Sequence, residues 1–418
     1  MNHSPRHRTV LFDHDGGVDD ILSLMMLLAM PHLKLAGVVV TPADCFLRPA
    51  VSASLKVLRF FNRLDIELSE GRLYGVNPFP RAWRAHAYAI DALPILNELK
   101  QLEEGATEEP GLPPQLPLPA YRGSGLSADQ PGPDIFKVLQ KRIYKKVIAD
   151  LAPAMDLVGL DHARDAVKER FIKVLTRENI VLSRTEQDRL FEAVLAEVLD
   201  KMAKLWARPV PEPGHKFLAR KIREAAEPVT VLITGPVSNL AAALAAEPAL
   251  AAKIEEVVWM GGALNVEGNV RDYEHDGSAE WNAYWDPPAT YRLWQFEAPL
   301  TIFPLDATNQ VRVSMEFLHQ LAQQRKYPLS DLAGQCWALT VGVIPAYEYV
   351  YHMWDTLTTG YLGAPGYIQF RQVRTEVIPQ GPSAGRIQEV SQGGKVIQAA
   401  ETVQVEKFYD YLLELFRR

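Results

Sequence analysis

The chain has 418 residues, of which 48% are hydrophobic and 23% carry a charge, a composition typical of a globular protein with an ample core. Its net charge of −7 gives no reason to expect binding to nucleic acid or to an anionic membrane surface. The two cysteines, Cys45 and Cys336, cannot form a disulfide framework, so we expect a reducing, cytoplasmic setting.

The first predicted elements alternate between strand and helix. In chain order they are a short buried strand at Thr9–Phe12, a loop at Asp13–Gly17, a helix at Val18–Met30, a strand at Leu33–Thr41 and a helix from about Ala50 to Asn62. The apolar run Ile21–Met30 is too short for a signal peptide or a membrane span, so we interpret it as a buried helix.

The same alternation returns late in the chain. It comprises the strand and turn "VTVLITGP", the helix "SNLAAALAA", the strand and turn "IEEVVWMGGA" and the strand and turn "LTIFPLDAT". Strands that alternate with helices predict an α/β fold with an open, mostly parallel sheet and helices on both faces. Sites in such folds collect at the carboxyl ends of strands, which singles out the loops at 13–20, 41–45, 234–236 and 260–262.

The middle of the chain has a different pattern. Residues 105–134 contain "EEPGLPPQLPLP" and "DQPGP", which exclude a regular helix or a central strand. A helical pattern follows at Ile135–Trp206 and ends at "RPVPEPG". Its apolar stripe consists of Leu190, Phe191, Val194, Leu195, Val198, Leu199, Met202, Leu205 and Trp206. We therefore predict a helical insertion at 105–214 within a catalytic domain formed by 1–104 and 215–418. Extra core or a dimer surface is the favoured role of the insertion, and a mobile lid is the alternative.

Four aspartates follow the first strand in "LFDHDGGVDD": Asp13, Asp15, Asp19 and Asp20. One or two acids would cap the helix that begins near Val18, but four exceed that need. Carboxylate and carbonyl oxygens are the ligands that Ca²⁺ accepts, and such an ion neutralises crowded negative charge. The cluster therefore predicts a calcium site.

A competing interpretation is a phosphatase of the haloacid dehalogenase type. Its pattern of an apolar strand followed by D-x-D-G-[TV] is half present, but Gly17 stands where Thr or Val is expected. The double aspartate also follows at once instead of near the end of the domain. This alternative ranks second.

Polar and aromatic residues in the later loops suit a nucleoside. Glu280 and Asn282 are two residues apart, so in an extended segment both face the same side, and their side chains can bind sugar hydroxyls. Asn269 adds another polar group. Trp83 and Trp354 offer flat apolar faces that could hold a planar base between them, although core packing is the ordinary role of each tryptophan alone.

The sequence resembles the nucleoside hydrolases, and most closely their purine-specific branch, which prefers inosine, adenosine and guanosine. The resemblance rests on "DHDGGVDD", "TPADCF", "NPFPRAWR", "LITGPVSNL", "WMGGA", "DGSAEWNAYWDPP", "LDATN" and "MWD", in that order. These motifs span residues 9–100 and about 215–365. The resemblance implies a purine nucleoside hydrolase, a glycosidase of purine salvage that uses Ca²⁺.

The resemblance also implies residue roles. Asp15 would be the general base and a calcium ligand; the other ligands would be Asp20, the backbone carbonyl of Thr234 and Asp355. Asp44 would join Asp15 in the catalytic site. Substrate contacts would come from Asp19, Trp83, Met260, Asn269, Glu280, Asn282 and Trp354. Asp13 would order its loop through backbone hydrogen bonds.

One departure from the wider family bears on the leaving base. The non-specific branch has a proton-donating His before the last calcium ligand, where this chain has Trp354. Stacking between two indoles would instead favour a cationic, protonated purine. We expect a small-molecule nucleoside as substrate and a homo-oligomer, with a dimer favoured. A catalytically silent nucleoside-binding scaffold is the remaining alternative.

Overall fold

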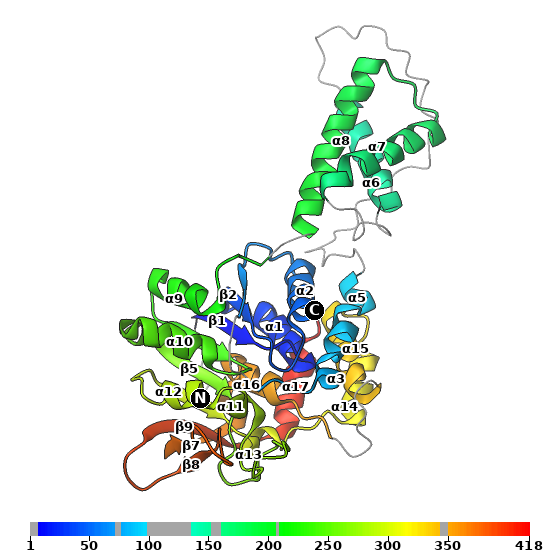
Figure 1. Ribbon diagram of the computed structural model, residues 1–418. Helices are drawn as coiled ribbons and strands as arrows, with labels where there is room; N and C mark the ends of the chain where they lie inside the picture. The colour runs from blue at the N-terminus through cyan, green and yellow to red at the C-terminus, as the bar shows by residue number, and fades with distance from the viewer. Residues whose placement is uncertain (1–6, 72–76, 98–134, 152–159, 206–208, 343–349) are drawn as a thin grey trace. The chain divides into compact units, whose positions relative to one another are not determined.

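The computed structural model describes residues 7–71, 77–97, 135–151, 160–205, 209–342 and 350–418 (Figure 1). The proline-rich segment predicted at 105–134 lies outside the described residues. The chain divides into two compact units, one formed by 1–102 and 208–418 and the other by 103–207.

One sheet organises the larger unit. Among the described residues it has nine strands in the order β3-β2-β1-β4-β5-β6-β9-β7-β8. The strands are β1 (Arg8–His14), β2 (Leu33–Val40), β3 (Leu68–Glu70), β4 (Val229–Ile233), β5 (Ile254–Met260), β6 (Leu300–Phe303), β7 (Ile368–Val377), β8 (Ile387–Glu389) and β9 (Lys395–Val403). The first seven strands of that spatial order, from β3 across to β9, pair in parallel. Strand β7 is antiparallel to both of its neighbours, β9 and β8. The predicted open, mostly parallel sheet is confirmed.

Helices cover both faces of this sheet, because its central strands are apolar on both sides. In β1, Val10 and Phe12 face one core, while Leu11 faces the other. The first core packs under helices that include α1 (Val18–Ala29), α2 (Leu47–Phe60), α4 (His86–Asp91), α5 (Pro94–Asn97), α14 (Met315–Gln323), α15 (Pro328–Gly342), α16 (Trp354–Gly363) and α17 (Val405–Leu415).

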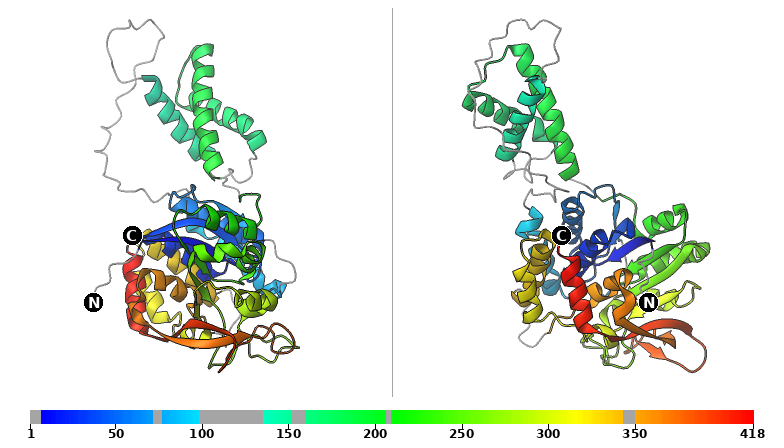
Figure 2. Two further views of the ribbon diagram at one scale, coloured as in Figure 1. Left: turned by 90° about the vertical axis from the view of Figure 1, so that its left-hand side faces the viewer. Right: turned by 180° about the vertical axis from the view of Figure 1, so that it is seen from behind.

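The second core packs under α9 (Gly214–Glu224), α10 (Ser238–Ala246) and α12 (Pro287–Leu293). Figure 2 shows α17 beside α16, and the antiparallel ribbon of β7 and β9 at one edge of the sheet. Short helices complete the unit: α3 (Arg81–Arg84), α11 (Trp281–Trp285), α13 (Leu305–Thr308) and the 3₁₀ turns η2 (Pro248–Lys253) and η3 (Pro365–Tyr367).

The smaller unit is helical in its described part. It contains α6 (Ile135–Leu151), α7 (Leu160–Arg177) and α8 (Arg184–Leu205), which share a core of their own. Ser183 and Glu186 form reciprocal hydrogen bonds at the start of α8, with Ser183 N donating to Glu186 Oε2 over 2.9 Å. The predicted stripe from Leu190 to Val198 lies in this core. The side chains of Met202 and Leu205, and all of Trp206, lie outside the described residues.

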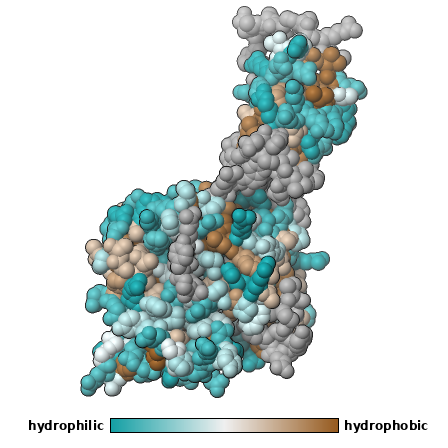
Figure 3. All heavy atoms as spheres, viewed as in Figure 1, coloured by the Kyte–Doolittle hydropathy of each residue, from teal (hydrophilic) through white to brown (hydrophobic). Residues whose placement is uncertain are grey.

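The larger unit resumes at Arg208, ahead of the predicted boundary at 215. The reason is that the backbone N–H of Val210 donates to the Leu68 carbonyl over 2.8 Å, and Val210 bridges to Ser69 as a parallel neighbour of β3. In the view of Figure 3 the described surface of the larger unit is mostly hydrophilic. No described helix is long and apolar enough to cross a membrane.

Candidate active site

Four strand ends place the candidate residues at one edge of the sheet. Strands β2, β1, β4 and β5 are consecutive and parallel, so their carboxyl ends meet. Gly16 in the first loop has a φ of +87°, and a Cβ there would lie 2.3 Å from Ala50 Cβ. The tight turn at Gly16 therefore connects the end of β1 directly to the beginning of α1.

Asp20 lies in the first turn of α1, and both of its carboxylate oxygens have partners. Oδ2 accepts a hydrogen bond from the Gly17 N–H at 2.8 Å, and Oδ1 accepts one from the Thr234 hydroxyl. Burial is the main cause that raises the pKa of Asp20 to about 7; the nearby charge of Asp19 adds to the effect, and hydrogen bonds with Asp15 and Thr234 oppose it. The contact with Thr234 joins the first loop to the loop after β4.

Asp15 is buried, and its Oδ2 atom has no hydrogen-bond partner among the described residues. A Cβ on Gly235 would approach that atom to 3.0 Å, so the glycine leaves room for the carboxylate. Burial raises the pKa of Asp15 well above its ordinary range, and the charges of Asp20, Asp44 and Asp355 add to the effect. Neighbouring carboxylates cannot all ionise in a buried site unless a cation offsets them.

Asp19 connects this cluster to the beginning of α16. Its Oδ1 accepts a hydrogen bond from the Tyr351 hydroxyl at 2.6 Å, and its Oδ2 accepts one from the Asp355 N–H at 3.1 Å. Burial raises the pKa of Asp355 well above its usual value, with further contributions from Asp19 and Asp20. Asp355, which lies 336 residues after Asp19, therefore belongs to the same buried group of charges as Asp19 and Asp20.

Asp13 orders its loop, but through side-chain donors instead of the expected backbone donors. It accepts hydrogen bonds from the Thr41 hydroxyl at 3.1 Å and from the Asn239 amide at 3.1 and 3.2 Å. Asn239 also donates to Thr41 over 2.8 Å. Because Asp13 lies near the end of β1, Thr41 directly follows β2 and Asn239 lies in α10, this network ties the ends of both strands to that helix.

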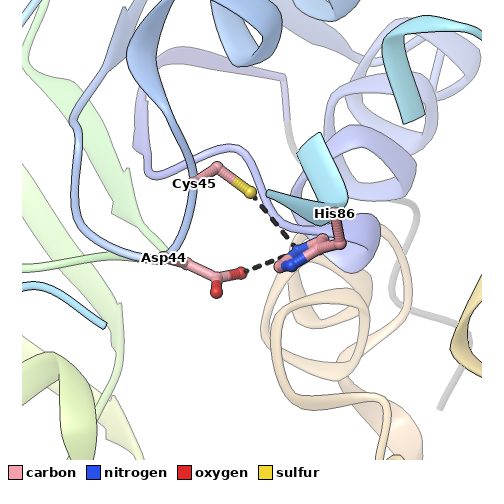
Figure 4. A group of neighbouring side chains, drawn as sticks. All are labelled: Asp44, Cys45 and His86. Carbon is pink, nitrogen blue, oxygen red and sulfur yellow. Dashed lines mark hydrogen bonds and ion pairs between the residues drawn. The ribbon is translucent and has the colours of Figure 1, made fainter. Parts of the chain in front are cut away.

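Asp44 follows β2 and faces a histidine that the sequence analysis did not select. Its Oδ2 lies 3.6 Å from His86 Nε2, which is also 3.3 Å from Cys45 Sγ (Figure 4). Burial opposes a charge on His86, but the Asp44 carboxylate and the Trp83 carbonyl outweigh it and raise the pKa of His86 to about 9. Asp44 thus stands between the aspartate cluster and α4.

The predicted sugar-binding residues contribute to two hydrogen-bond networks. Asn282 donates to the Met260 carbonyl over 2.9 Å and to the Thr234 carbonyl over 3.5 Å. Glu280 caps α11 and accepts from the N–H groups of Asn282 at 2.9 Å and Gly262 at 3.0 Å. Burial raises the pKa of Glu280 to about 7 in spite of these donors. These residues hold the loops after β4 and β5 together.

Asn269 and the two candidate tryptophans lie around these loops. Asn269 Oδ1 accepts from the Trp281 N–H at 3.0 Å. Trp354 packs beside Met260 and donates through Nε1 to Asn309 over 3.1 Å. Trp83 on α3 is 52% exposed and meets Phe79 edge-on, with ring centroids 5.3 Å apart. One indole is thus anchored and the other is open to solvent.

Comparison with known proteins accounts for this arrangement. Residues 10–410 match the family described as inosine-uridine preferring nucleoside hydrolase. The chain belongs to that family. The inosine-uridine preferring nucleoside hydrolase from Bacillus anthracis is 30% identical in sequence, with a TM-score of 0.68 over 98% of this chain and 99% of that one.

Other relatives of this chain differ in the substrate preference that their names state. Pyrimidine-specific ribonucleoside hydrolase RihA from Escherichia coli is 29% identical over 187 residues, which are 41% of this chain and 58% of the relative. The chain thus matches somewhat over half the length of that relative. The purine-preferring ribonucleoside hydrolase from Gardnerella vaginalis shares the fold, with 18% identity, a TM-score of 0.60 and coverage of 98% of both chains.

Family membership confirms the nucleoside hydrolase part of the resemblance and disfavours the phosphatase alternative. The names of the relatives state inosine-uridine, pyrimidine and purine preferences, so they do not confirm that this chain belongs to the purine-specific branch. Three contacts were not predicted from the sequence: Tyr351 with Asp19, Asn239 with Asp13, and His86 with Asp44. Tyr351 stands in the same short "YHMWD" stretch as Asp355, and His86 stands one helical turn after Trp83, so sequence proximity was the available signal.

Proposed function

We propose that the protein hydrolyses the N-glycosidic bond of purine ribonucleosides in a calcium-dependent reaction, releasing ribose and the free base. The observation that carries this proposal is the unpartnered Asp15 Oδ2 inside a buried group of carboxylates. A buried polar oxygen without a partner is costly, and such atoms in a native protein call for a ligand, an ion or a catalytic role.

The residues fit a hard cation. Asp15, Asp20 and Asp355 supply carboxylate oxygens, and Thr234 supplies its backbone carbonyl as the fourth proposed ligand. Burial raises the pKa of each of these three carboxyls, and the charges of nearby aspartates add to the effect, so a divalent ion would stabilise their ionised forms. When bound, calcium would neutralise these groups and make a nearby water more acidic.

Asp15 is the proposed general base. Its free Oδ2 can accept the proton of the attacking water, while its neighbours hold it in place. The breaking glycosidic bond leaves positive charge on the ribosyl ring, which the surrounding carboxylates stabilise by electrostatic attraction. Asp44 adds a further carboxylate beside the Gly17 backbone and is proposed to orient the same water.

The sugar would lie between the aspartates and the loop that carries Asn282. Asp19 and Asn282 are proposed to bind ribose hydroxyls, and Met260 to line the sugar pocket. Asn269 and Glu280 are proposed to reach the 5′-hydroxyl. Binding would require exchange of some hydrogen bonds, because Glu280 already accepts several backbone N–H groups.

We propose that stacking of the base on tryptophan side chains assists its departure as the leaving group. Trp354 directly precedes Asp355, and an indole N–H cannot protonate a base near neutrality. Its face, together with that of Trp83, would stabilise the purine as it becomes cationic. This argument favours purines over pyrimidines, because pyrimidines have a smaller ring and no N7. The inosine-uridine and pyrimidine-specific preferences of the relatives make base selection the decisive test.

The test is release of free ribose from inosine, guanosine, adenosine, uridine and cytidine, with and without a chelator. We expect purine nucleosides to be cleaved well and chelation to abolish cleavage. Release of phosphate from inosine monophosphate is measured in parallel, because it would reveal phosphatase activity. Efficient uridine cleavage would contradict the purine part alone, and no ribose release from any nucleoside would contradict the hydrolase itself.

A further inference from the structure

A second group of ligand-type side chains lies beside the aspartate cluster. Asp44, Cys45 and His86 each present one donor atom, and these atoms all lie within 4.8 Å of one another (Figure 4). Asp44 and Cys45 come from the loop after β2, and His86 is the first residue of α4. Oxygen, sulfur and nitrogen donors from two elements therefore converge on one point.

The separations of the other two donor atoms from His86 suit tetrahedral coordination. Zinc bonds of about 2.0 Å to nitrogen and oxygen and about 2.3 Å to sulfur, at tetrahedral angles, separate the donor atoms by roughly 3.3–3.6 Å. His86 Nε2 lies 3.6 Å from Asp44 Oδ2 and 3.3 Å from Cys45 Sγ. The Asp44 and Cys45 donor atoms lie within 4.8 Å of each other, so the side chains would draw together to place all three donors around one ion.

The orientation of His86 supports this use. Its Nδ1 is within hydrogen-bond distance of the Trp83 carbonyl, which can only accept, so Nδ1 carries its proton. Metal-binding histidines are held in the same way, with one ring nitrogen donating to a carbonyl or carboxylate and the other facing the ion. Nε2 is the nitrogen that faces Asp44 and Cys45.

Local charge also favours a dication. Burial raises the pKa of the Cys45 thiol well above its ordinary value, and the charges of Asp44, Asp15 and Asp20 raise it further, against a smaller opposing effect of Arg84. The same negative field attracts a divalent ion, which deprotonates a coordinating thiol. The thiol proton, and the second proton of a charged His86, would pass to solvent, so affinity would rise with pH.

We propose that Asp44, Cys45 and His86 form a binding site for a thiophilic divalent transition metal ion such as Zn²⁺. The thiolate and imidazole donors select such an ion over Ca²⁺, which prefers oxygen ligands. A consequence that rests on the proposed function is inhibition, because an ion on Asp44 would withdraw that carboxylate from the hydrolase site. Binding itself does not depend on that function.

The experiment titrates the full-length protein with Co²⁺ and Zn²⁺ while excess Ca²⁺ is present. Thiolate-to-cobalt charge transfer in the near-ultraviolet spectrum reports a bound thiolate, and elemental analysis gives the zinc stoichiometry. Cys45→Ser and His86→Gln are the test variants. Cys336→Ser is the matched control, since Cys336 is the other buried free cysteine and lies in α15.

We expect one equivalent of zinc in the parent protein and in Cys336→Ser, with the cobalt charge-transfer band in both. Removing an outer partner of a metal ligand costs 10–100-fold in affinity, so loss of a ligand should cost about 100-fold or more. Absence of the band from the parent, its loss in Cys336→Ser, or full zinc binding by Cys45→Ser would overturn the proposal. If Cys45→Ser does not fold, His86→Gln supplies the same comparison, and the parent spectrum remains decisive.

Discussion

The carboxylate half and the aromatic half of the candidate site are built in different ways. Asp15, Asp19 and Asp20 are at most 3% exposed, and their neighbours come from strand ends and helix starts across the sheet. Trp83, by contrast, is 52% exposed on a helix of four residues. Under the proposed function, the chemistry would depend on the buried core of the fold, whereas base selection would depend partly on its surface. Substitutions in the two halves should therefore differ in kind.

The largest effect is expected from Asp15→Asn. An amide cannot take the proton of the attacking water, and loss of a general base lowers turnover by roughly 10²–10⁴-fold. Folding should persist, because the change removes one of several mutually repelling charges. Ribose release from inosine measures the effect. Asp65→Asn, which alters an exposed carboxylate paired with Arg63, is the control, and Asp15→Asn activity within threefold of the parent would show that Asp15 is not the base.

Asp20→Ala and Asp355→Ala test the cation in the carboxylate half. Each change removes one charged oxygen from the proposed ligand set, so calcium affinity should fall by about tenfold or more. Calcium titration of the protein by calorimetry measures this directly. Exhaustively chelated protein that still hydrolyses nucleosides at the normal rate would remove the cation from the proposal.

Trp354→Ala and Trp83→Ala test the aromatic half. A desolvated cation–π contact is worth about 2 kcal/mol, so Trp354→Ala should lower kcat on inosine by roughly 30-fold. Trp83→Ala should have a smaller effect, because its ring is half exposed. Tyr291→Ala, at an exposed aromatic residue on α12, is the control. A Trp354→Ala enzyme that changes only KM would exclude stacking as the leaving-group device.

The smallest expected effect is the change of thermal stability with pH. The folded-state pKa values of Asp13, Asp20 and Glu280 are each about 7 because of burial, whereas unfolded carboxyls titrate near pH 4. The folded state therefore holds these protons more tightly, so their contribution to stability is complete at low pH and is lost as pH rises through about 7. In chelator, Tm should fall by several degrees between pH 6 and pH 8.

Added calcium should reduce that pH dependence if the cation binds among the buried carboxyls, since it would stabilise their ionised forms. The same thermal scans, repeated with saturating calcium, provide this comparison. A Tm that rises between pH 6 and pH 8 in chelator would contradict the proposed protonation of the buried carboxyls.

The two halves also differ in what the sequence could predict. The loop that follows β1 was predictable, because an apolar strand, a cluster of acids and an apolar helix are adjacent in the chain. The contacts of Asp19 were not, since Tyr351 and Asp355 lie 332 and 336 residues away. Such contacts depend on how α16 packs beside α1, which no local pattern specifies.

The antiparallel edge of the sheet was not predicted either. Its signal was present, since Val373, Thr375 and Val377 are buried at alternate positions of β7, the period of a strand with one covered face. Pairing with β9 and β8 is non-local and leaves little trace in either strand alone. In the smaller unit, by contrast, the apolar stripe of α8 sufficed to predict a helix, because helical hydrogen bonds are local.

The way the chain returns to the sheet limits how far this protein can be shortened. The backbone of Val210 and Glu212 binds Leu68 and Ser69, so it covers the outer edge of β3. A deletion confined to 103–207 keeps that cover, whereas one extended through residue 213 leaves unpaired strand backbone exposed to other molecules. Light scattering of the two truncated proteins should reveal self-association of the longer deletion alone. We therefore expect the segment next to the insertion to protect the protein against aggregation.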